Sequence, residues 1–334
     1  MIKILLTEPI RPLGMDYLAK EPDVEIVIAP DARPETAAGL AVDCQGIISR
    51  NTRIDRRVFR NAPKLKVVAS HGVGTDHVDV EAATAHGICV VNTPGANAES
   101  VAEVVTGFML MLSRKLAQGD RALRIERDYY SRNRWIGRDL FHKTILIVGL
   151  GAIGRRLARI CKEAFEMRVL GYDPYLTEEQ LAALGVEKVE DLNQGLPQAD
   201  FVSLNCPYTG ELYHLINARR LALMKPDAYL INCARGQLID DKALAEALKS
   251  EKIAGAALDV FSQEPPDRDD PLFDCPNLIA TPHIGANAQD SIDNMSLLSA
   301  MDVMSVIRGE PGKARVANRQ ALADREKPWE RLAR

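Results

Sequence analysis

Short apolar segments alternate with helix-length spacers along most of this chain, and no other feature constrains the fold as strongly. Strands separated by such spacers pair in parallel and are joined by crossover helices. The expected strands form two series: 2–6, 24–28, 46–49, 66–70 and 88–91, then 144–148, 168–172, 200–204, 228–232, 255–260 and 277–280. The pattern predicts an α/β protein with two Rossmann-like, doubly wound parallel-sheet domains and a cleft between them.

A chain of 334 residues also exceeds what one compact core usually holds. After the last strand, residues 286–307 have a helical pattern long enough to travel back toward the first domain. We therefore expect a discontinuous domain of residues 1–96 plus 287–334, and a second domain of residues 97–286. The polar tail from Arg315, which contains Trp329, is expected to fray, with docking on a neighbouring subunit as the alternative.

A long helix is expected from residue 97 to about 114, with a second helical stretch continuing through Tyr129. The apolar residues of the first helix recur at helical spacing: Val101, Val104, Val105, Phe108, Met109 and Leu112. This face either packs inside the molecule or forms a dimer interface, and the sequence leaves both alternatives open.

The bulk composition excludes several classes of protein. A hydrophobic fraction of 46% with 26% charged residues is typical of a globular enzyme. A net charge of −4 argues against binding to nucleic acid. No apolar run reaches the length of a spanning helix, and residues 2–7 are expected to be a first strand rather than a signal peptide. Six scattered cysteines without a CxxC pair favour reduced thiols in a cytoplasm and no metal site.

A glycine-rich turn follows the expected strand 144–148 and precedes a helix. It consists of Gly149, Leu150, Gly151, Ala152, Ile153 and Gly154. In such a βαβ unit the first glycine permits the turn, the second admits a pyrophosphate, and the third lets helix and strand pack closely. Asp173, at the end of the next strand, offers a carboxylate to a ribose diol and has no arginine beside it, so NAD is favoured over NADP. A turn that packs but binds nothing is the alternative.

Three residues of the second domain predict chemistry. Arg235 directly follows a buried strand, where a guanidinium can hold a substrate carboxylate with two parallel hydrogen bonds. His283 follows another strand and can exchange a proton with a carbonyl oxygen, and Glu264 can orient its ring and favour the protonated form. The site therefore predicts a hydride-transfer enzyme that reduces a carbonyl of a substrate held by its carboxylate.

Further residues are candidates for the same site. Asp259 ends a strand and either binds the nicotinamide amide or caps a loop. In the first domain, successive amides of the loop Gly72, Val73 and Gly74 are expected to make an anion nest for the carboxylate, with His71 beside it. The remaining histidines are expected to be structural.

At these residues the chain resembles the NAD-dependent D-2-hydroxyacid dehydrogenases. The resemblance covers nearly the whole length and is carried by residues 224–244 (MKPDAYLINCARGQLIDDKAL), 281–285 (TPHIG) and 92–97 (NTPGAN). It implies that Arg235 binds the substrate carboxylate, that Glu264 and His283 form the acid/base pair, and that Asp259 belongs to the nicotinamide site. It also implies homodimers formed through the cofactor domain, which favours the helix from residue 97 as the interface. Cys206, Pro207 and Cys233 are expected to line the cofactor site.

The chain departs from the family pattern at two places. Asn205 stands where many members have a histidine, which implies altered cofactor contacts. Phosphoglycerate dehydrogenases tend to show Arg-Ser shortly before a threonine, whereas here Arg50 is displaced by one position. We therefore expect hydroxypyruvate or glyoxylate as substrate, with Arg50 near it, D-3-phosphoglycerate dehydrogenase activity as the alternative, and a non-catalytic NAD-sensing protein as the alternative from another class.

Overall fold

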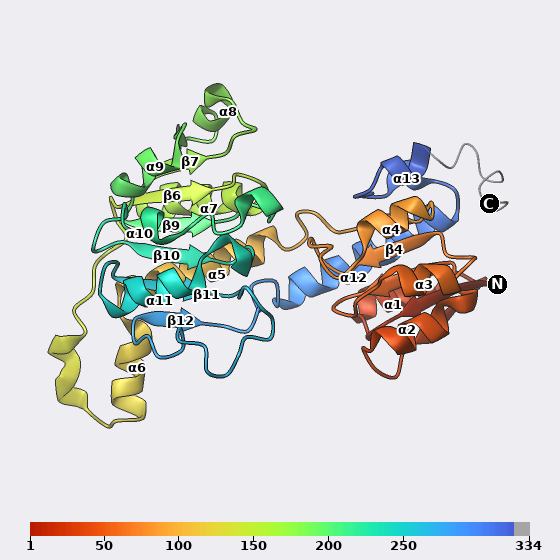
Figure 1. Cartoon of the computed structure of the whole chain (residues 1–334), viewed down its shortest axis with the longest axis horizontal. Helices are drawn as coiled ribbons and strands as arrows, with labels where there is room; N and C mark the ends of the chain where they lie inside the picture. Colours follow the sequence, from red (N-terminus) through yellow and green to blue (C-terminus); the bar gives the residue numbers. More distant parts are fainter. Residues whose placement is uncertain (324–334) are drawn as a thin grey trace. The chain divides into compact units, whose positions relative to one another are not determined.

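The computed structural model describes residues 1–323 and divides into two compact units. Unit 1 contains Met1–Asn97 and the chain from Asn287 onward, and unit 2 contains Ala98–Ala286 (Figure 1). The division falls at 97/98 and 286/287, where the sequence placed it at 96/97 and 286/287. In the described part of the chain, the structure contains no helix that is both long and apolar enough to span a membrane.

Unit 1 is built on a five-stranded parallel sheet in the order β2-β1-β3-β4-β5. Its strands are β1 (Ile2–Leu6), β2 (Val24–Ile28), β3 (Gly46–Ser49), β4 (Val67–Ser70) and β5 (Cys89–Val91). Its helices are α1 (Pro12–Ala19), α2 (Pro34–Leu40), α3 (Arg56–Asn61), α4 (Val80–Ala85), α12 (Gln289–Ile307) and α13 (Gln320–Ala323). One face of the sheet shares a core with α2, α3 and α4, and the opposite face shares a core with α1 and α12.

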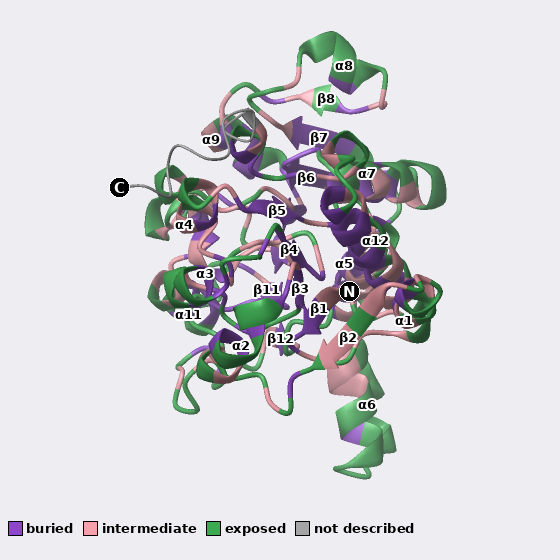
Figure 2. Cartoon of the chain, turned by 90° about the vertical axis from the view of Figure 1, so that its right-hand side faces the viewer, coloured by how far each residue is buried: buried purple, intermediate pink, exposed green. Residues whose placement is uncertain are grey.

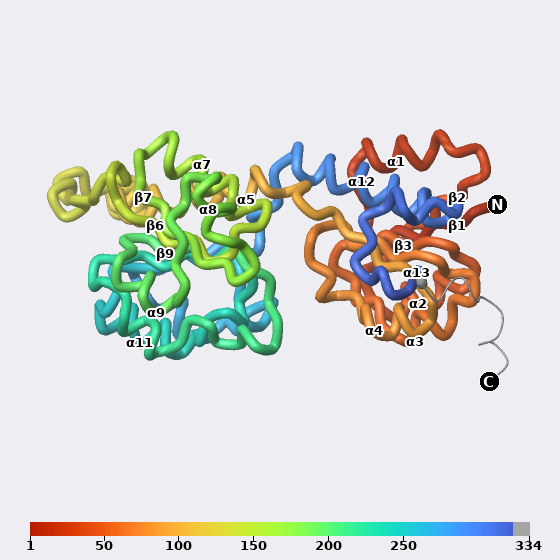
Figure 3. Tube along the Cα trace, turned by 90° about the horizontal axis from the view of Figure 1, so that it is seen from above, coloured from red at the N-terminus to blue at the C-terminus, as the bar shows by residue number. Residues whose placement is uncertain are grey.

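Helix α12 brings the end of the chain back to the first sheet. It lies alongside α1 and packs on β3, β4 and β5 (Figure 3). Gly46 of β3 makes this approach possible, since a Cβ there would come within 2.7 Å of Val303 on α12. The expected return of the chain to the first domain is thus seen in the packing.

The segment after Arg315 does not fray within the described residues, so that expectation was wrong there. Val316 forms an antiparallel bridge with Val91 of β5. Asn318 is buried, accepts a hydrogen bond from the Val90 amide and donates one to the Ile88 carbonyl. A polar segment therefore completes the exposed edge of the sheet, and Trp329 lies outside the described residues.

Unit 2 is built on a seven-stranded parallel sheet in the order β12-β11-β10-β9-β6-β7-β8. Its strands are β6 (Thr144–Val148), β7 (Arg168–Tyr172), β8 (Glu187–Lys188), β9 (Phe201–Leu204), β10 (Tyr229–Asn232), β11 (Gly255–Leu258) and β12 (Leu278–Ala280). The strand order reverses between β6 and β9, and ligands of open α/β sheets bind beyond the carboxyl ends of the strands at such a point. Two doubly wound parallel sheets confirm the predicted fold class.

The helices of unit 2 are α5 (Ala98–Ser113), α6 (Leu116–Arg124), α7 (Ala152–Phe165), α8 (Glu178–Ala182), α9 (Leu192–Gly195), α10 (Ala218–Leu221) and α11 (Asp241–Lys249). The apolar face of α5 packs on α7, β10 and β11, and Val105, Phe108 and Met109 are buried there. Internal packing within unit 2 therefore accounts for most of this face, although Val104 is only partly buried, and a dimer interface here stays a prediction.

The second helical stretch ends at Arg124, earlier than expected, and a 3₁₀ turn follows at Tyr129–Arg134. Together α6 and this turn form an arm, residues 116–136, that projects from the sheet of unit 2 (Figure 1). Most of α6 is exposed (Figure 2), and the arm carries large exposed side chains, among them Ile125 at 67%, Tyr130 at 90% and Ile136 at 76%.

Candidate active site

The glycine-rich turn joins β6 to α7 at the point where the strand order reverses. Gly149 has a left-handed backbone with φ 89°, and a Cβ there would come within 2.7 Å of the Cys206 amide nitrogen. A Cβ on Gly154 would collide with the Gly149 carbonyl. Glycine is therefore required at both positions, because the turn packs against the loop after β9 and against its own helix.

The start of α7 fits a diphosphate. Gly151 is the N-cap residue, no side chain caps the helix, and the space around the Gly151 Cα is open. The amides of Ala152 and Ile153 lie in the first turn, where an α-helix has no acceptors of its own. An anion placed here would meet free N–H groups and the positive end of the helix dipole. These residues fit the diphosphate of a dinucleotide.

Asp173 follows β7 and lies against the glycine-rich turn. One carboxylate oxygen accepts a hydrogen bond from the Leu150 amide at 2.9 Å, and the other accepts one from the Tyr175 amide at 3.0 Å. Sequence reasoning missed this role, in which Asp173 holds the turn in place. A contact of this carboxylate with a ribose diol stays a prediction.

Three further cofactor candidates surround this turn. Cys206 and Pro207 follow β9, and Cys233 follows β10. Burial raises the pKa of Cys206 to about 11 and also raises the pKa of Cys233, so both thiols are protonated near neutral pH. Asn205, which stands at the position of a family histidine, donates from its amide to Ser203. Neither thiol is therefore an ionised nucleophile, and a place for these residues in the cofactor site stays a prediction.

The three predicted catalytic residues meet at one edge of the sheet. Arg235 follows β10, Glu264 lies in the loop after β11, and His283 follows β12, all at the carboxyl ends of adjacent strands. The Nδ1 atom of His283 lies 2.7 Å from Glu264 Oε2. The positive charge of Arg235 lowers the pKa of both Glu264 and His283.

Electrostatics within the trio set the proton affinity of the imidazole. The hydrogen bond that His283 donates to the Glu264 carboxylate is the largest influence on the His283 pKa, and the pKa is raised although burial and the charge of Arg235 oppose this. For Glu264, burial raises the pKa, but the hydrogen bond and charge of His283, with the Phe261 amide and Arg235, leave the pKa lowered. The pair therefore favours a carboxylate beside an imidazolium, which is the form that can donate a proton.

Asp259 fixes the turn that carries His283. It is only 1% exposed, and its carboxylate accepts hydrogen bonds from the Thr281 hydroxyl and from the amides of Ile284 and Gly285, at 2.6 to 2.8 Å. These bonds hold His283 in a left-handed conformation with φ 54°, which is unusual for a residue with a side chain. Of the two alternatives from the sequence, the structure shows the loop-capping role, and a contact with nicotinamide stays a prediction.

The loop of Arg235 is fixed by similar means. The side chain of buried Asn232 donates to the Arg235 carbonyl and accepts from the Ala234 amide. A Cβ on Gly236 would collide with the backbone of Phe261, so the two loops touch directly. The Phe261 amide in turn donates to Glu264. Arg235 and Glu264 are thus positioned by adjoining loops.

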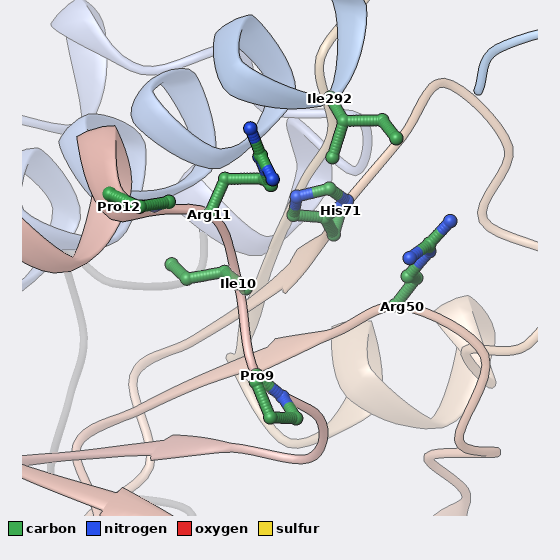
Figure 4. Close-up of a pocket in the computed structure, with 7 residues that line it drawn as sticks. All are labelled: Pro9, Ile10, Arg11, Pro12, Arg50, His71 and Ile292. Carbon is green, nitrogen blue, oxygen red and sulfur yellow. The ribbon is translucent and has the colours of Figure 1, made fainter. Parts of the chain in front are cut away.

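The substrate candidates of unit 1 lie on the loops after β3 and β4. Within residues 1–323, the amides of Gly72, Val73 and Gly74 have no hydrogen-bond acceptor, whereas all three carbonyls of this loop accept hydrogen bonds. Free amides are what an anion nest requires. Arg50 and His71 line a cavity of about 300 Å³ (Figure 4). The sequence did not single out the other residues of its lining, Pro9, Ile10, Arg11, Pro12 and Ile292, because nothing in their local pattern relates segments so distant along the chain.

Comparison with known proteins places this site in a family. The model of the "D-isomer specific 2-hydroxyacid dehydrogenase, NAD binding domain" matches residues 106–285. Fold and site together define a dehydrogenase of the Rossmann class, and the chain belongs to the D-isomer specific 2-hydroxyacid dehydrogenases. The predicted family and its NAD cofactor are thereby confirmed.

Individual relatives agree with this assignment. D-3-phosphoglycerate dehydrogenase of Methanocaldococcus jannaschii is 42% identical over 93% of this chain and 58% of its own length. Glyoxylate reductase of Pyrococcus horikoshii is 38% identical over 98% of this chain and 99% of its own length. Among solved structures, the TT0316 protein of Thermus thermophilus has a TM-score of 0.85 at 33% identity and covers 94% of this chain and 99% of its own. The chain thus spans somewhat more than half the length of the phosphoglycerate dehydrogenases it matches.

Proposed function

We propose that this protein is an NAD-dependent oxidoreductase that interconverts a small 2-oxo acid and its D-2-hydroxy acid. The observation that carries the proposal is the pair of His283 and Glu264 at 2.7 Å, next to Arg235, at the carboxyl ends of adjacent strands. An ionised acid, a protonated imidazole and a guanidinium are the groups that carbonyl reduction of an anionic substrate requires.

Bound NAD would accept a hydride from C2 of the hydroxy acid in the direction of oxidation. Bound NADH would supply a hydride to C2 of the oxo acid in the direction of reduction. The amides of Ala152 and Ile153, beside Gly151, would hold its diphosphate, and Asp173 would bind a ribose diol. A 2′-phosphate would meet the negative charge of Asp173, so we propose a preference for NAD over NADP.

The chain's own residues then handle the carboxylate and the proton. Arg235 binds the substrate carboxylate. In the direction of reduction, the imidazolium of His283 donates its Nε2 proton to the carbonyl oxygen. Glu264 stays on Nδ1 and stabilises the charged ring. In the direction of oxidation, the neutral ring accepts the hydroxyl proton.

For the substrate we propose hydroxypyruvate or glyoxylate. The match to a glyoxylate reductase over 99% of its length supports this choice. The alternative, D-3-phosphoglycerate dehydrogenase activity, is supported by the relative at 42% identity. Arg50 has an exposed guanidinium, but it lies on the loop after β3 and contacts the neutral side chain of Asn287.

We also propose that the protein is a homodimer formed through the cofactor domain. Because most of the apolar face of α5 is covered within unit 2, we propose the arm of residues 116–136 as a further contact surface of the dimer. Its exposed side chains Ile125, Tyr130 and Ile136 form the kind of apolar projection that a second copy buries. A cytoplasmic location remains a prediction from the sequence.

The test is an assay of NADH oxidation with a panel of 2-oxo acids on wild-type protein and on His283→Ala. We expect turnover by the wild type and loss of most turnover in the variant, with NADH affinity nearly unchanged. His142→Ala is the matched control, since His142 also has a left-handed backbone and pairs with a carboxylate, that of Glu166 at 3.9 Å, on an exposed surface. A wild type that binds NADH without turning over any substrate would instead indicate the non-catalytic NAD sensor.

A further inference from the structure

The loop that carries Glu264 is exposed, although it holds one of the reactive groups. Residues 262–265 are all exposed, whereas Phe261, directly before them, is only 6% exposed. Burial of apolar side chains therefore fixes the start of the loop and not the part that carries the carboxylate. Since Glu264 lies 2.7 Å from the His283 ring, polar contacts have to hold these residues in place.

Ser262 supplies such contacts, and both come from one neighbouring segment, residues 237–241. The Ser262 carbonyl accepts a hydrogen bond from the side chain of Gln237 at 3.0 Å. The Ser262 hydroxyl donates to a carboxylate oxygen of Asp241, which is the first residue of α11. The segment that follows Arg235 thus anchors the loop of Glu264 through a single serine.

The surroundings of Asp241 make its contact with Ser262 a strong one. Burial raises the pKa of Asp241, and the charge of Asp270 acts in the same direction, whereas the hydroxyl and amide of Ser262 and the nearby His214 lower it. The carboxylate has therefore lost part of its hydration and has Ser262 as a partner instead. A hydrogen bond to a charged group is roughly twice as strong as one between neutral groups.

We infer that Asp241 is a positioning residue of the acid/base pair: through the Ser262 hydroxyl it holds the exposed loop in the place where Glu264 meets the His283 ring. The inference rests on the proposed function and adds a residue to it. All the groups concerned belong to unit 2. When the contact between Asp241 and Ser262 is lost, the loop samples other positions, and Glu264 spends less time at the ring.

The direction of the resulting change follows from the charges around His283. The hydrogen bond to Glu264 and the charges of Glu264 and Asp259 raise the pKa of His283, while burial and the charge of Arg235 lower it. A loop that leaves the ring part of the time weakens the largest of these influences, so the pKa of His283 should fall. In this inference Asp241 changes that pKa only through the position of Glu264.

Variants at both ends of the contact separate position from charge. Asp241→Ala and Ser262→Ala each remove the hydrogen bond, and Ser262→Ala leaves every charge in place. Asp241→Asn keeps an acceptor for the hydroxyl, and Ser262→Thr keeps the hydroxyl. The control is Glu246→Ala, which removes another acid of α11, one that is exposed.

The measurement is the NMR titration of the His283 ring in the whole chain, with the signal assigned by means of His283→Gln. It is accompanied by kcat and KM for reduction of the panel of 2-oxo acids with NADH, and by the melting temperature of each protein. Because Ser262 is exposed and lies outside the helices, Ser262→Ala tests the inference even if Asp241→Ala weakens α11.

We expect Asp241→Ala and Ser262→Ala each to lower the proton affinity of His283 roughly two- to fivefold. The double variant should do no more than either alone, since both changes remove the same contact. Reduction uses the protonated ring, so kcat above the pKa should fall by at least the same factor, while KM for NADH changes little. Asp241→Asn should retain most of the wild-type affinity, and Ser262→Thr and Glu246→Ala should retain all of it.

Two results would overturn the inference. Either Ser262→Ala leaves the titration of His283 unchanged, which would make the charge of Asp241 the cause of any effect, or the effects of the two variants add in the double variant. Failure of the proposed function is a separate result: the titration would change as expected in a protein that turns over no 2-oxo acid.

Discussion

Replacing Glu264 with glutamine tests how the active-site imidazole is kept protonated. The change keeps the size and shape of the side chain and removes its charge. The hydrogen bond at 2.7 Å between His283 Nδ1 and Glu264 Oε2 then no longer joins a carboxylate to an imidazolium. The Phe261 amide, which donates to the other oxygen of Glu264, still finds an acceptor in the variant if the amide group is oriented suitably.

The size of the effect follows from the exposure of the pair. A hydrogen bond to a charged group contributes about 1.5–3 kcal/mol. The side chains of His283 and Glu264 are 52% and 39% exposed, so solvent screens their interaction, and we reduce this to about 1–2 kcal/mol. That range corresponds to about a 5- to 30-fold weaker preference for the protonated ring.

The sign of the pH dependence is fixed by the same contact. The hydrogen bond that His283 donates to Glu264 raises the pKa of His283, and carbonyl reduction uses the protonated ring. In the wild type, kcat/KM for reduction therefore falls only as the pH rises through this raised pKa. In Glu264→Gln the fall begins at lower pH, and oxidation of the hydroxy acid, which uses the neutral ring, begins at lower pH as well.

The assay is the pH profile of kcat/KM in both directions, with NADH affinity measured separately by fluorescence. Glu166→Gln is the matched control, because Glu166 lies 3.9 Å from the exposed ring of His142 and its loss should leave the profile unchanged. Equal loss of activity at every pH, with no displacement of the profile, would refute the reasoning and would mean that Glu264 only holds its loop together.

Three further perturbations test other parts of the molecule. Gly285→Ala places a Cβ 2.9 Å from a carboxylate oxygen of Asp259, so turnover should fall roughly 10-fold or more while NADH affinity changes little. The control is Gly107→Ala, which should leave the kinetics unaltered because a Cβ there meets nothing within 4 Å. Replacing Asp173 with serine and introducing an arginine beside it should shift the ratio of kcat/KM values toward NADPH, and an unaltered ratio would disprove the ribose assignment. Ile125→Asp on the arm should convert a dimer to a monomer in analytical ultracentrifugation, and a persistent dimer would exclude the arm as the interface.

The alternation of apolar segments predicted eleven of the strands because strands buried on both faces are continuous apolar runs. Their ends were less predictable. Strand β11 was expected to reach Val260, yet it ends at Leu258, because the chain leaves the sheet where Asp259 turns to cap the neighbouring loop. Strand β8, Glu187–Lys188, was missed since two charged residues at a sheet edge carry no apolar signal.

The sequence predicted the residues of the candidate site more completely in unit 2 than in unit 1. In unit 2 the functional residues follow strands, so their sequence positions alone predicted that Arg235 and His283 lie at one edge of the sheet. In unit 1 the cavity wall comes from loops after several strands and from α12. Neither Arg11 nor Ser296 has a local pattern that relates it to His71, and only the folded chain joins them.

The geometry of the catalytic trio depends on residues that have no chemical role of their own. Asp259 and Gly285 fix the turn of His283, Asn232 fixes the loop of Arg235, and Gly236 lets that loop touch the one that carries Glu264. Each of these contacts joins the carboxyl end of a strand to a neighbouring loop, so the rigid sheet holds the reactive groups in place. A displacement of about 1 Å at a reacting group can lower the rate about 100-fold. Substitutions at these supporting positions should therefore lower kcat as strongly as changes in the trio, while leaving the distant diphosphate site at Gly151 intact.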